Sequence, residues 1–103
     1  MYLVVFVTCP GMKEAKKLSD VLLGERLAAC VNIVPDLKSY FWWGGKIHDA
    51  EEVLLVVKTK QKVLRRLVRE VKRNHQYENP EIIALPIVGG SKEYTEWMEE
   101  ETI

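Results

Sequence analysis

The chain has 103 residues, of which 48% are hydrophobic and 29% charged, a composition typical of a folded domain. Fifteen basic residues balance fifteen acidic ones, so no overall electrostatic field favours nucleic acid or an anionic membrane. No segment reaches the roughly 18 consecutive apolar residues of a membrane span, and residues 1–7 lack the basic start of a signal peptide. We therefore expect one domain, residues 1–103, in the cytoplasm, with no nucleic-acid or membrane partner.

The first half of the chain predicts a strand, a helix and a long strand. Residues 2–8 form a short apolar run that ends at Pro10 and Gly11, as a strand would. From Met12 to about Gly24, apolar residues recur at spacings of three and four, which indicates a helix. Residues 27–34 are apolar without helical spacing, and an aromatic run at 39–43 follows. We interpret 27–43 as one long strand that bends at Pro35.

The second half predicts a hairpin, a helix, a strand and a short helix. A Gly44-Gly45 turn connects the long strand to a third strand over residues 52–59. Apolar residues then fall on one face of a strongly amphipathic helix at 62–73, and residues 81–87 read as a fourth strand. The basic residues on the outer face of this helix lack interleaved aromatics, which favours a solvated face. Ser91 is a good N-cap for a final helix.

The order strand, helix, strand, strand, helix, strand is the split βαβ pattern. It predicts an α+β fold of the ferredoxin-like type, with a four-stranded antiparallel sheet, both main helices on one face and a short C-terminal strand or helix extension. The opposite face then has no helix to cover it. That bare face and the sheet edges are natural contacts for another copy of the chain.

Two adjacent tryptophans, Trp42 and Trp43, also point to assembly. Consecutive side chains on a strand point to opposite faces, so both indoles cannot cover the same core. Because an indole left in water exposes a large apolar area, we expect a second subunit to cover one of them. The alternative is that one indole packs under a loop of its own chain.

Several short motifs occur in a fixed order along the chain. They are Thr8-Cys9-Pro10, Arg26-Leu27-Ala28-Ala29-Cys30-Val31-Asn32, Trp43-x-Gly45-Lys46-Ile47, Glu52 leading to Lys58-Thr59, His75-x-Tyr77-Glu78-x-Pro80-Glu81 and Tyr94-x-x-Trp97. Together they resemble the CutA divalent-cation tolerance proteins from one end of the chain to the other. The resemblance implies a ferredoxin-like subunit, a homotrimer built like the PII signalling proteins, a cytoplasmic location and a link to copper and other divalent cations. No enzymatic activity is firmly tied to that family.

His75 and Cys9 are the candidate metal ligands. A neutral imidazole is a common ligand for copper or zinc, and Cys9 precedes a predicted helix, whose N-terminal dipole favours a thiolate. The alternatives are a histidine bonded to backbone and a cysteine that only packs. Copper-binding members of the family carry Cys and His where this chain has Val7 and Asn74, so only His75 of that ligand set carries over.

The two cysteines raise two further points. Cys9 and Cys30 form no Cys-x-x-Cys pair, so both are expected to remain reduced thiols, with Cys30 in the core. A Cys9–His75 nucleophilic pair would imply a thiol enzyme, but no third orienting group or oxyanion loop is recognisable. We therefore expect a protein that is not an enzyme.

Charged and aromatic residues beside the apolar strands suggest a cleft between subunits. The residues that would line it are Trp43, Lys46, Lys58, Tyr77 and Glu81. Unpaired charges are costly beside apolar strands, so mutual pairing of the charged members is one interpretation. The other is a cleft for a small anion or metabolite. The sequence thus favours a homotrimeric binding or signalling module that binds a divalent cation weakly, with a PII-like small-molecule sensor as the alternative.

Overall fold

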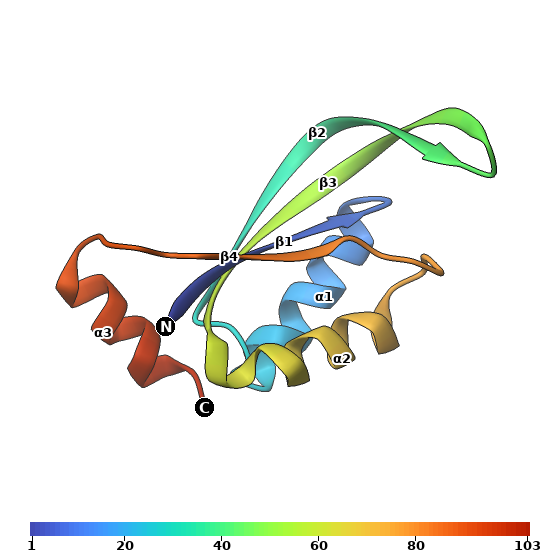
Figure 1. Cartoon of the computed structure of the whole chain (residues 1–103). Coiled ribbons are helices and arrows are strands. Elements are labelled where there is room, and N and C mark those ends of the chain that lie inside the picture. The colour runs from blue at the N-terminus through green and yellow to red at the C-terminus, as the bar shows by residue number, and fades with distance from the viewer.

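The computed structural model describes all residues from Met1 to Ile103 and contains a single four-stranded sheet (Figure 1). The elements in chain order are β1 (Tyr2–Cys9), α1 (Met12–Gly24), β2 (Cys30–Trp43), β3 (Lys46–Lys60), a 3-10 turn (Gln61–Val63), α2 (Leu64–Asn74), β4 (Ile82–Pro86) and α3 (Lys92–Glu101). The strand order is β2-β3-β1-β4 and every pairing is antiparallel. The predicted α+β fold is confirmed.

The core lies between the sheet and the helices α1 and α2, which pack on the same face (Figure 1). Alternate residues of β1 and β3 point into it, and Val5, Leu55 and Val57 have no exposed surface. Leu18 and Leu22 of α1 and Leu67 and Val71 of α2 meet these strands from the other side. The helices therefore form because their three- and four-residue apolar spacing matches this one sheet face.

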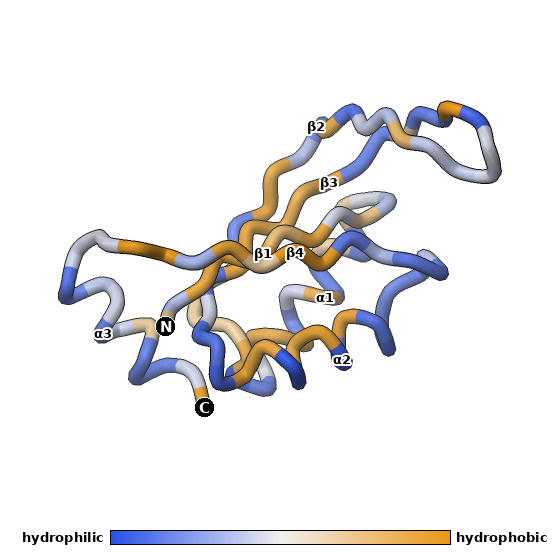
Figure 2. Tube along the Cα trace, in the orientation of Figure 1, coloured by the Kyte–Doolittle hydropathy of each residue, from blue (hydrophilic) through white to orange (hydrophobic).

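The opposite sheet face carries no helix, as predicted, and it is largely apolar. Val4 and Phe6 of β1 lie on it, and β4 adds Ile83 and Leu85, which are 52% and 41% exposed. Hydropathy along the chain shows the apolar centre of the sheet and the hydrophilic outer parts of α2 and α3 (Figure 2). We call this side of the sheet the open face.

The hairpin of β2 and β3 extends well beyond the core (Figure 1). Gly44 and Gly45 form its turn with φ values of 59° and 78°, a conformation that glycine adopts without strain. An irregularity in the pairing between Val34 and Leu37 accompanies the bend predicted at Pro35. β3 begins at Lys46, six residues earlier than predicted, because the polar residues before the apolar run also pair with β2.

The predicted C-terminal extension is the helix α3, which packs at the end of β3. Ser91 caps it, since its Oγ accepts a hydrogen bond from the Tyr94 amide. The buried Lys60 Nζ lies 2.6 Å from Glu99 Oε2 and 3.3 Å from the carbonyl oxygen of Thr102. Because these acceptors surround the ammonium group, Lys60 fixes the C-terminal end of α3 to the sheet.

Candidate functional site

The largest concave feature is a groove between the outer hairpin and the segment that precedes β4. Its volume is about 810 Å³. The lining residues come from the end of β1, the hairpin and the loop after α2: Thr8, Ser39, Tyr40, Phe41, Trp42, Trp43, His48, Ala50, Glu52, Tyr77, Glu78, Asn79, Pro80 and Glu81. We call it the aromatic groove. A groove of this size falls in the range that holds small organic ligands.

One hydrogen bond ties the two walls of the aromatic groove together. The Tyr77 hydroxyl donates to Glu52 Oε2 at 2.8 Å. Glu52 is only 8% exposed, so this bond satisfies an acceptor that has little access to water. Burial of the Tyr77 hydroxyl and its bond to Glu52 raise the pKa of Tyr77 to about 12. Tyr77 therefore keeps its proton and remains a donor.

His75 fixes the loop that carries Tyr77. Its Nε2 lies 2.7 Å from the Thr8 carbonyl oxygen, and its Nδ1 lies 3.0 Å from the Tyr77 amide nitrogen. A carbonyl only accepts and an amide N–H only donates, so the proton of the neutral ring is on Nε2. Both ring nitrogens are thus engaged with the backbone. This matches the alternative in which His75 bonds to backbone, and a metal would have to displace one of these two bonds.

Cys9 is fully buried next to the Thr8 carbonyl that His75 contacts. Burial, followed by the nearby charges of Glu14 and Glu52, raises the pKa of the Cys9 thiol to about 12. The thiol is therefore protonated, and the helix dipole of α1 does not make it a thiolate. No hydrogen bond joins Cys9 to His75, so the arrangement lacks an activated nucleophile. As placed, the two residues do not form a ready metal site.

Cys30 is a free thiol that lies outside the core. It opens β2, which is an edge strand, and it pairs with Lys58 on the open face. The prediction that Cys30 is a core residue is therefore wrong, because the register turns its side chain to the open face, while its neighbours Val31 and Ile33 pack against the core. Both cysteines are unpaired thiols.

The predicted cleft residues are only partly brought together. Trp43, Tyr77 and Glu81 line the aromatic groove. Lys46 pairs with Trp43 at the hairpin tip, and Lys58 lies further along the open face of β3, so neither lines the groove of one chain. Whether these two lysines line a cleft made with a second chain stays a prediction. Their ammonium groups form no ion pair within the chain, so their pairing with carboxylates across such a cleft also stays a prediction.

Sequence reasoning missed His48 and Phe41 as groove residues. Their rings stack with centroids 5.9 Å apart, and His48 Nε2 lies 3.1 Å from the Trp43 carbonyl oxygen. His48 is exposed and also lines the aromatic groove. The two-residue turn Gly44-Gly45 fixes the register of the hairpin, and this register places His48 opposite Phe41. The turn is visible in the sequence, so the pairing of these two rings could have been predicted.

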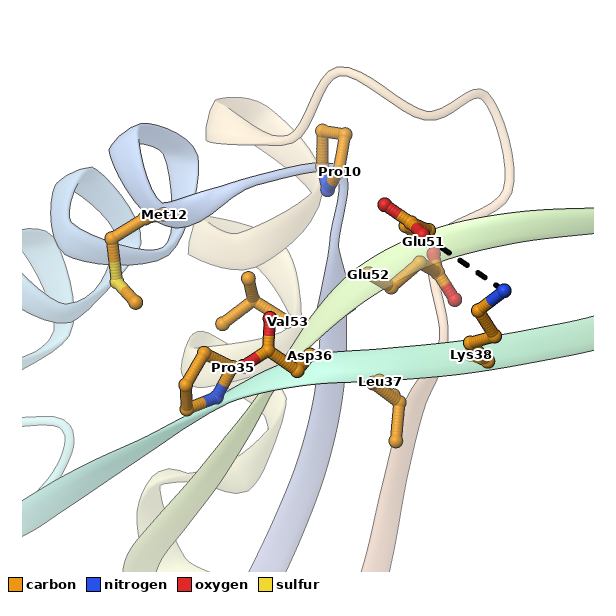
Figure 3. Close-up of a pocket in the computed structure, with 9 residues that line it drawn as sticks. All are labelled: Pro10, Met12, Pro35, Asp36, Leu37, Lys38, Glu51, Glu52 and Val53. Carbon is orange, nitrogen blue, oxygen red and sulfur yellow. Dashed lines mark ion pairs between the residues drawn. The ribbon is translucent and has the colours of Figure 1, made fainter.

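A second, smaller pocket of about 310 Å³ lies at the bend of the hairpin (Figure 3). Pro10 and Met12 form one side, and Pro35, Asp36 and Lys38 contribute from β2. The Lys38 Nζ lies 4.0 Å from Glu51 Oε1, the contact drawn as a dashed line. Both side chains are exposed, so this pair adds little stability. Sequence analysis did not predict this pocket.

These features define a class of protein: a ferredoxin-like α+β domain with an open apolar sheet face and a ligand-sized groove. The sequence profile described as "CutA1 divalent ion tolerance protein" matches residues 3–101. The chain belongs to this family.

Relatives in sequence and in structure align with almost the whole chain. It is 46% identical over 99 residues to the divalent-cation tolerance protein CutA of Thermus thermophilus, covering 96% of each chain. The solved structure of the Thermus thermophilus protein superposes with a TM-score of 0.98 at 45% identity, over 99% of each chain. CutA1 from Oryza sativa gives a TM-score of 0.96 at 46% identity, covering 99% of this chain and 94% of that one.

Some relatives are longer than this chain. It is 47% identical over 100 residues to the chloroplastic CutA 1 of Oryza sativa, which covers 97% of this chain but 56% of that protein. The chain thus spans about half the length of the chloroplastic relatives that it matches. These relatives are named for CutA or for divalent-cation tolerance, and none for an enzymatic activity. No helix of the structure is long and apolar enough to cross a membrane.

Proposed function

We propose that the chain is a non-enzymatic, cytoplasmic binding module that acts as a homotrimer in divalent-cation tolerance. The observation that carries this proposal is the open sheet face, which is apolar and has no cover in a single chain. Trp43, which is 51% exposed, extends this face along the hairpin, while Trp42, which is 71% exposed, lies on the other side of the hairpin. Monomeric proteins rarely leave contiguous apolar patches of this kind in water.

The geometry of the sheet supports a ring of subunits. β2 and β4 are the two edge strands, and each leaves backbone donors and acceptors unpaired along one side. Contact between the β2 edge of one chain and the β4 edge of the next is a head-to-tail interface, which closes into a ring of three when each chain is rotated by about one third of a turn from the last. The projecting hairpin can reach across such an interface and bury its indoles.

Divalent-cation binding is proposed to be weak in this chain. Nowhere do three His, Cys, Asp or Glu side chains lie close enough together to hold a metal ion. His75 must break a hydrogen bond to the Thr8 carbonyl or to the Tyr77 amide before it can act as a ligand. Cys9 must also lose a tightly held proton. Copper, which binds imidazole well, is the cation for which His75 is best suited.

Copper titration of metal-free protein tests this part of the proposal. We expect His75→Ala to weaken Cu²⁺ binding severalfold, and His48→Ala, which removes the chain's other histidine, to leave it unchanged. Binding should also weaken at acidic pH, because a protonated imidazole cannot act as a ligand. Equal binding by the wild type and His75→Ala would remove His75 from the site.

A second candidate function is a PII-like sensor of a small molecule. The aromatic groove favours it, because its volume of about 810 Å³ is far larger than a metal ion requires. A panel of metabolites tested for thermal stabilisation separates this function from metal binding. The expected positive result is a stabilising ligand whose effect is lost in Trp43→Ala, and a panel without such a ligand speaks against it.

A further inference from the structure

The outer surface of α2 is strongly basic. Six lysines and arginines fall within residues 62–73, and the helical period places them opposite the buried residues Leu67 and Val71. All six are exposed, whereas the only acidic residue of the helix, Glu70, is buried. The whole chain carries equal numbers of basic and acidic residues, so this surface is a local concentration of positive charge.

Only half of these cations have a counterpart in the chain. Arg66 pairs with Glu25 at 3.2 Å, and Arg73 pairs with Glu70 at 3.0 Å. A third, Lys62, lies in the 3-10 turn before the helix, and its charge acts on a glutamate of α3. The remaining three form no ion pair: Arg65, Arg69 and Lys72. Their spacing of four and three residues places them on one stripe of the helix, which we call the basic stripe.

The basic stripe lowers the stability of α2. Arg65 lies in the first turn of the helix, where a positive charge opposes the helix dipole. That turn contains no acidic residue, and no side chain caps it. Arg69 follows Arg65 by four residues, a spacing at which like charges repel. Because nothing in the chain offsets these costs, the stripe is better explained by an acidic partner than by solubility alone.

This surface lies away from the contacts proposed between subunits. α2 packs on the sheet face opposite the open face, and its basic side points away from the sheet. Figure 1 shows α2 on the side of the molecule opposite the projecting hairpin. α2 exposes no large hydrophobic side chain, so it has no apolar patch for a subunit to cover. The basic stripe is therefore accessible both in a monomer and in an assembly through the open face.

We propose that the outer face of α2 is a docking surface for a short acidic segment of another protein. A guanidinium group matches the geometry of a carboxylate and can bind it through two hydrogen bonds. Alternate side chains of an extended segment are about 6.6 Å apart, and the helical rise from Arg65 to Arg69 is about 6 Å. Successive carboxylates can thus reach successive cations. They would also supply the negative charge that the first turn of α2 lacks.

Two other classes of partner suit this surface less well. A long nucleic acid would extend past α2 toward α3, whose five glutamates repel it, and α2 has no aromatic side chain on which a base could stack. A membrane surface binds more strongly when apolar side chains insert beside the basic ones, and α2 exposes no large one. A short acidic segment needs only the local charge.

Three dye-labelled peptides of equal length test the proposal. In each, serine alternates with a second residue, which is glutamate, glutamine or lysine. Fluorescence anisotropy in the presence of EDTA measures their binding to the wild-type protein. The glutamate peptide should bind at least roughly tenfold more tightly than the glutamine peptide, and the lysine peptide should bind most weakly. Raising the salt concentration from about 50 to about 200 mM should weaken binding of the glutamate peptide severalfold.

Substitutions then locate the binding surface. Arg69→Gln should weaken binding of the glutamate peptide by roughly fivefold. Lys92→Gln on α3 is the matched control, because it removes one exposed positive charge elsewhere and should change nothing. Arg65→Glu should weaken binding by roughly tenfold or more, because it also adds repulsion.

The same Arg65→Glu variant separates docking from a structural role. It places an acidic residue in the first turn of α2, four residues before Arg69, so both the helix dipole and the new pair should stabilise the helix. Its midpoint of thermal unfolding should therefore rise while its affinity for the peptide falls. A residue that served only the fold would lose stability on substitution.

Several results would overturn the proposal. They are equal affinity for the glutamate and glutamine peptides, equal losses in Arg69→Gln and Lys92→Gln, and a lower unfolding midpoint in Arg65→Glu. Tighter binding of an oligodeoxythymidine or of phosphatidylserine vesicles, compared at equal charge, would show that the partner class is wrong. Growth of particle mass at low salt that Arg65→Glu abolishes would assign the surface to the acidic α3 of a second copy. None of these results depends on copper or on the number of subunits, so this proposal and the proposed function can fail separately.

Discussion

The inner and outer halves of β3 belong to one continuous strand but have opposite surroundings. In the inner half, Leu55, Val57 and Thr59 have no exposed surface, because β1, β2 and both main helices enclose them. In the outer half, Ile47 is 63% exposed and only β2 pairs with the strand. The inner half is stabilised by its own chain. The outer half leaves apolar side chains exposed to water, and contact with a second chain or a ligand would cover them.

The largest expected effect comes from breaking the enclosed half. Leu67 of α2 has no exposed surface, and Leu67→Ala should lower the free energy of unfolding by about 3 kcal/mol, through lost burial and an unfilled cavity. Urea unfolding at a fixed chain concentration measures this. Val88→Ala is the control, since Val88 is 99% exposed and should change stability by less than about 0.5 kcal/mol. Similar values for the two variants would contradict the described core.

The next effect concerns assembly of the outer half. Trp43→Ala should weaken subunit association by about 2 kcal/mol, because an indole in an interface contributes more than most contacts. Analytical ultracentrifugation over a range of concentrations gives the association constants. Arg66→Ala is the comparison, since Arg66 is exposed on α2 and pairs only with Glu25. If Arg66→Ala weakens assembly as much as Trp43→Ala, the interface lies on the helices and not on the hairpin.

A smaller effect is expected where the two halves meet. Tyr77→Phe removes the donor that satisfies the buried Glu52 carboxylate, and it should cost about 1 to 2 kcal/mol of stability. Faster hydrogen exchange in residues 75–81 would show that the loop has loosened. Tyr40→Phe is the matched control, because no hydrogen bond to the Tyr40 hydroxyl exists in the chain. Unchanged exchange in Tyr77→Phe would mean that His75 alone holds the loop.

The smallest effect is a pH dependence. The pKa of Glu81 is raised in the folded chain, so the folded state keeps a proton that the unfolded state loses as the pH rises above the ordinary value of 4.5. The Glu81 contribution to the free energy of unfolding therefore falls as the pH rises through this range. Glu81→Gln should flatten the pH profile, and Glu100→Gln should not. An identical slope in wild type and Glu81→Gln would contradict the interaction with Glu52.

Much of the fold could be predicted because the apolar residues that recur along each helix and strand are the ones that pack into the core. The three- and four-residue spacing of α1 and α2 and the Gly44-Gly45 turn needed no long-range information. Cys30 was misplaced because a continuous apolar run does not reveal which of its residues point to the core face and which to the open face. The extent of β3 was underestimated because its outer half is polar, and only pairing with β2 makes it a strand.

The site was less predictable because it depends on contacts between distant segments. The bond between Tyr77 and Glu52 joins residues 25 positions apart, and that between His75 and Thr8 joins residues 67 apart. Sequence reasoning selected Tyr77 and His75, but it could not show that backbone groups occupy both imidazole nitrogens. It also could not show how deeply Cys9 is buried, and this burial determines the state of its thiol.

The central claim is that the open face and the outer hairpin are covered by two further copies of the chain. Multi-angle light scattering of tag-free protein at micromolar concentration tests it most directly. We predict a single species with three times the chain mass of 11.9 kDa, which Trp43→Ala shifts toward smaller species. A stable monomer in which Trp42 and Trp43 remain exposed to solvent would contradict the account.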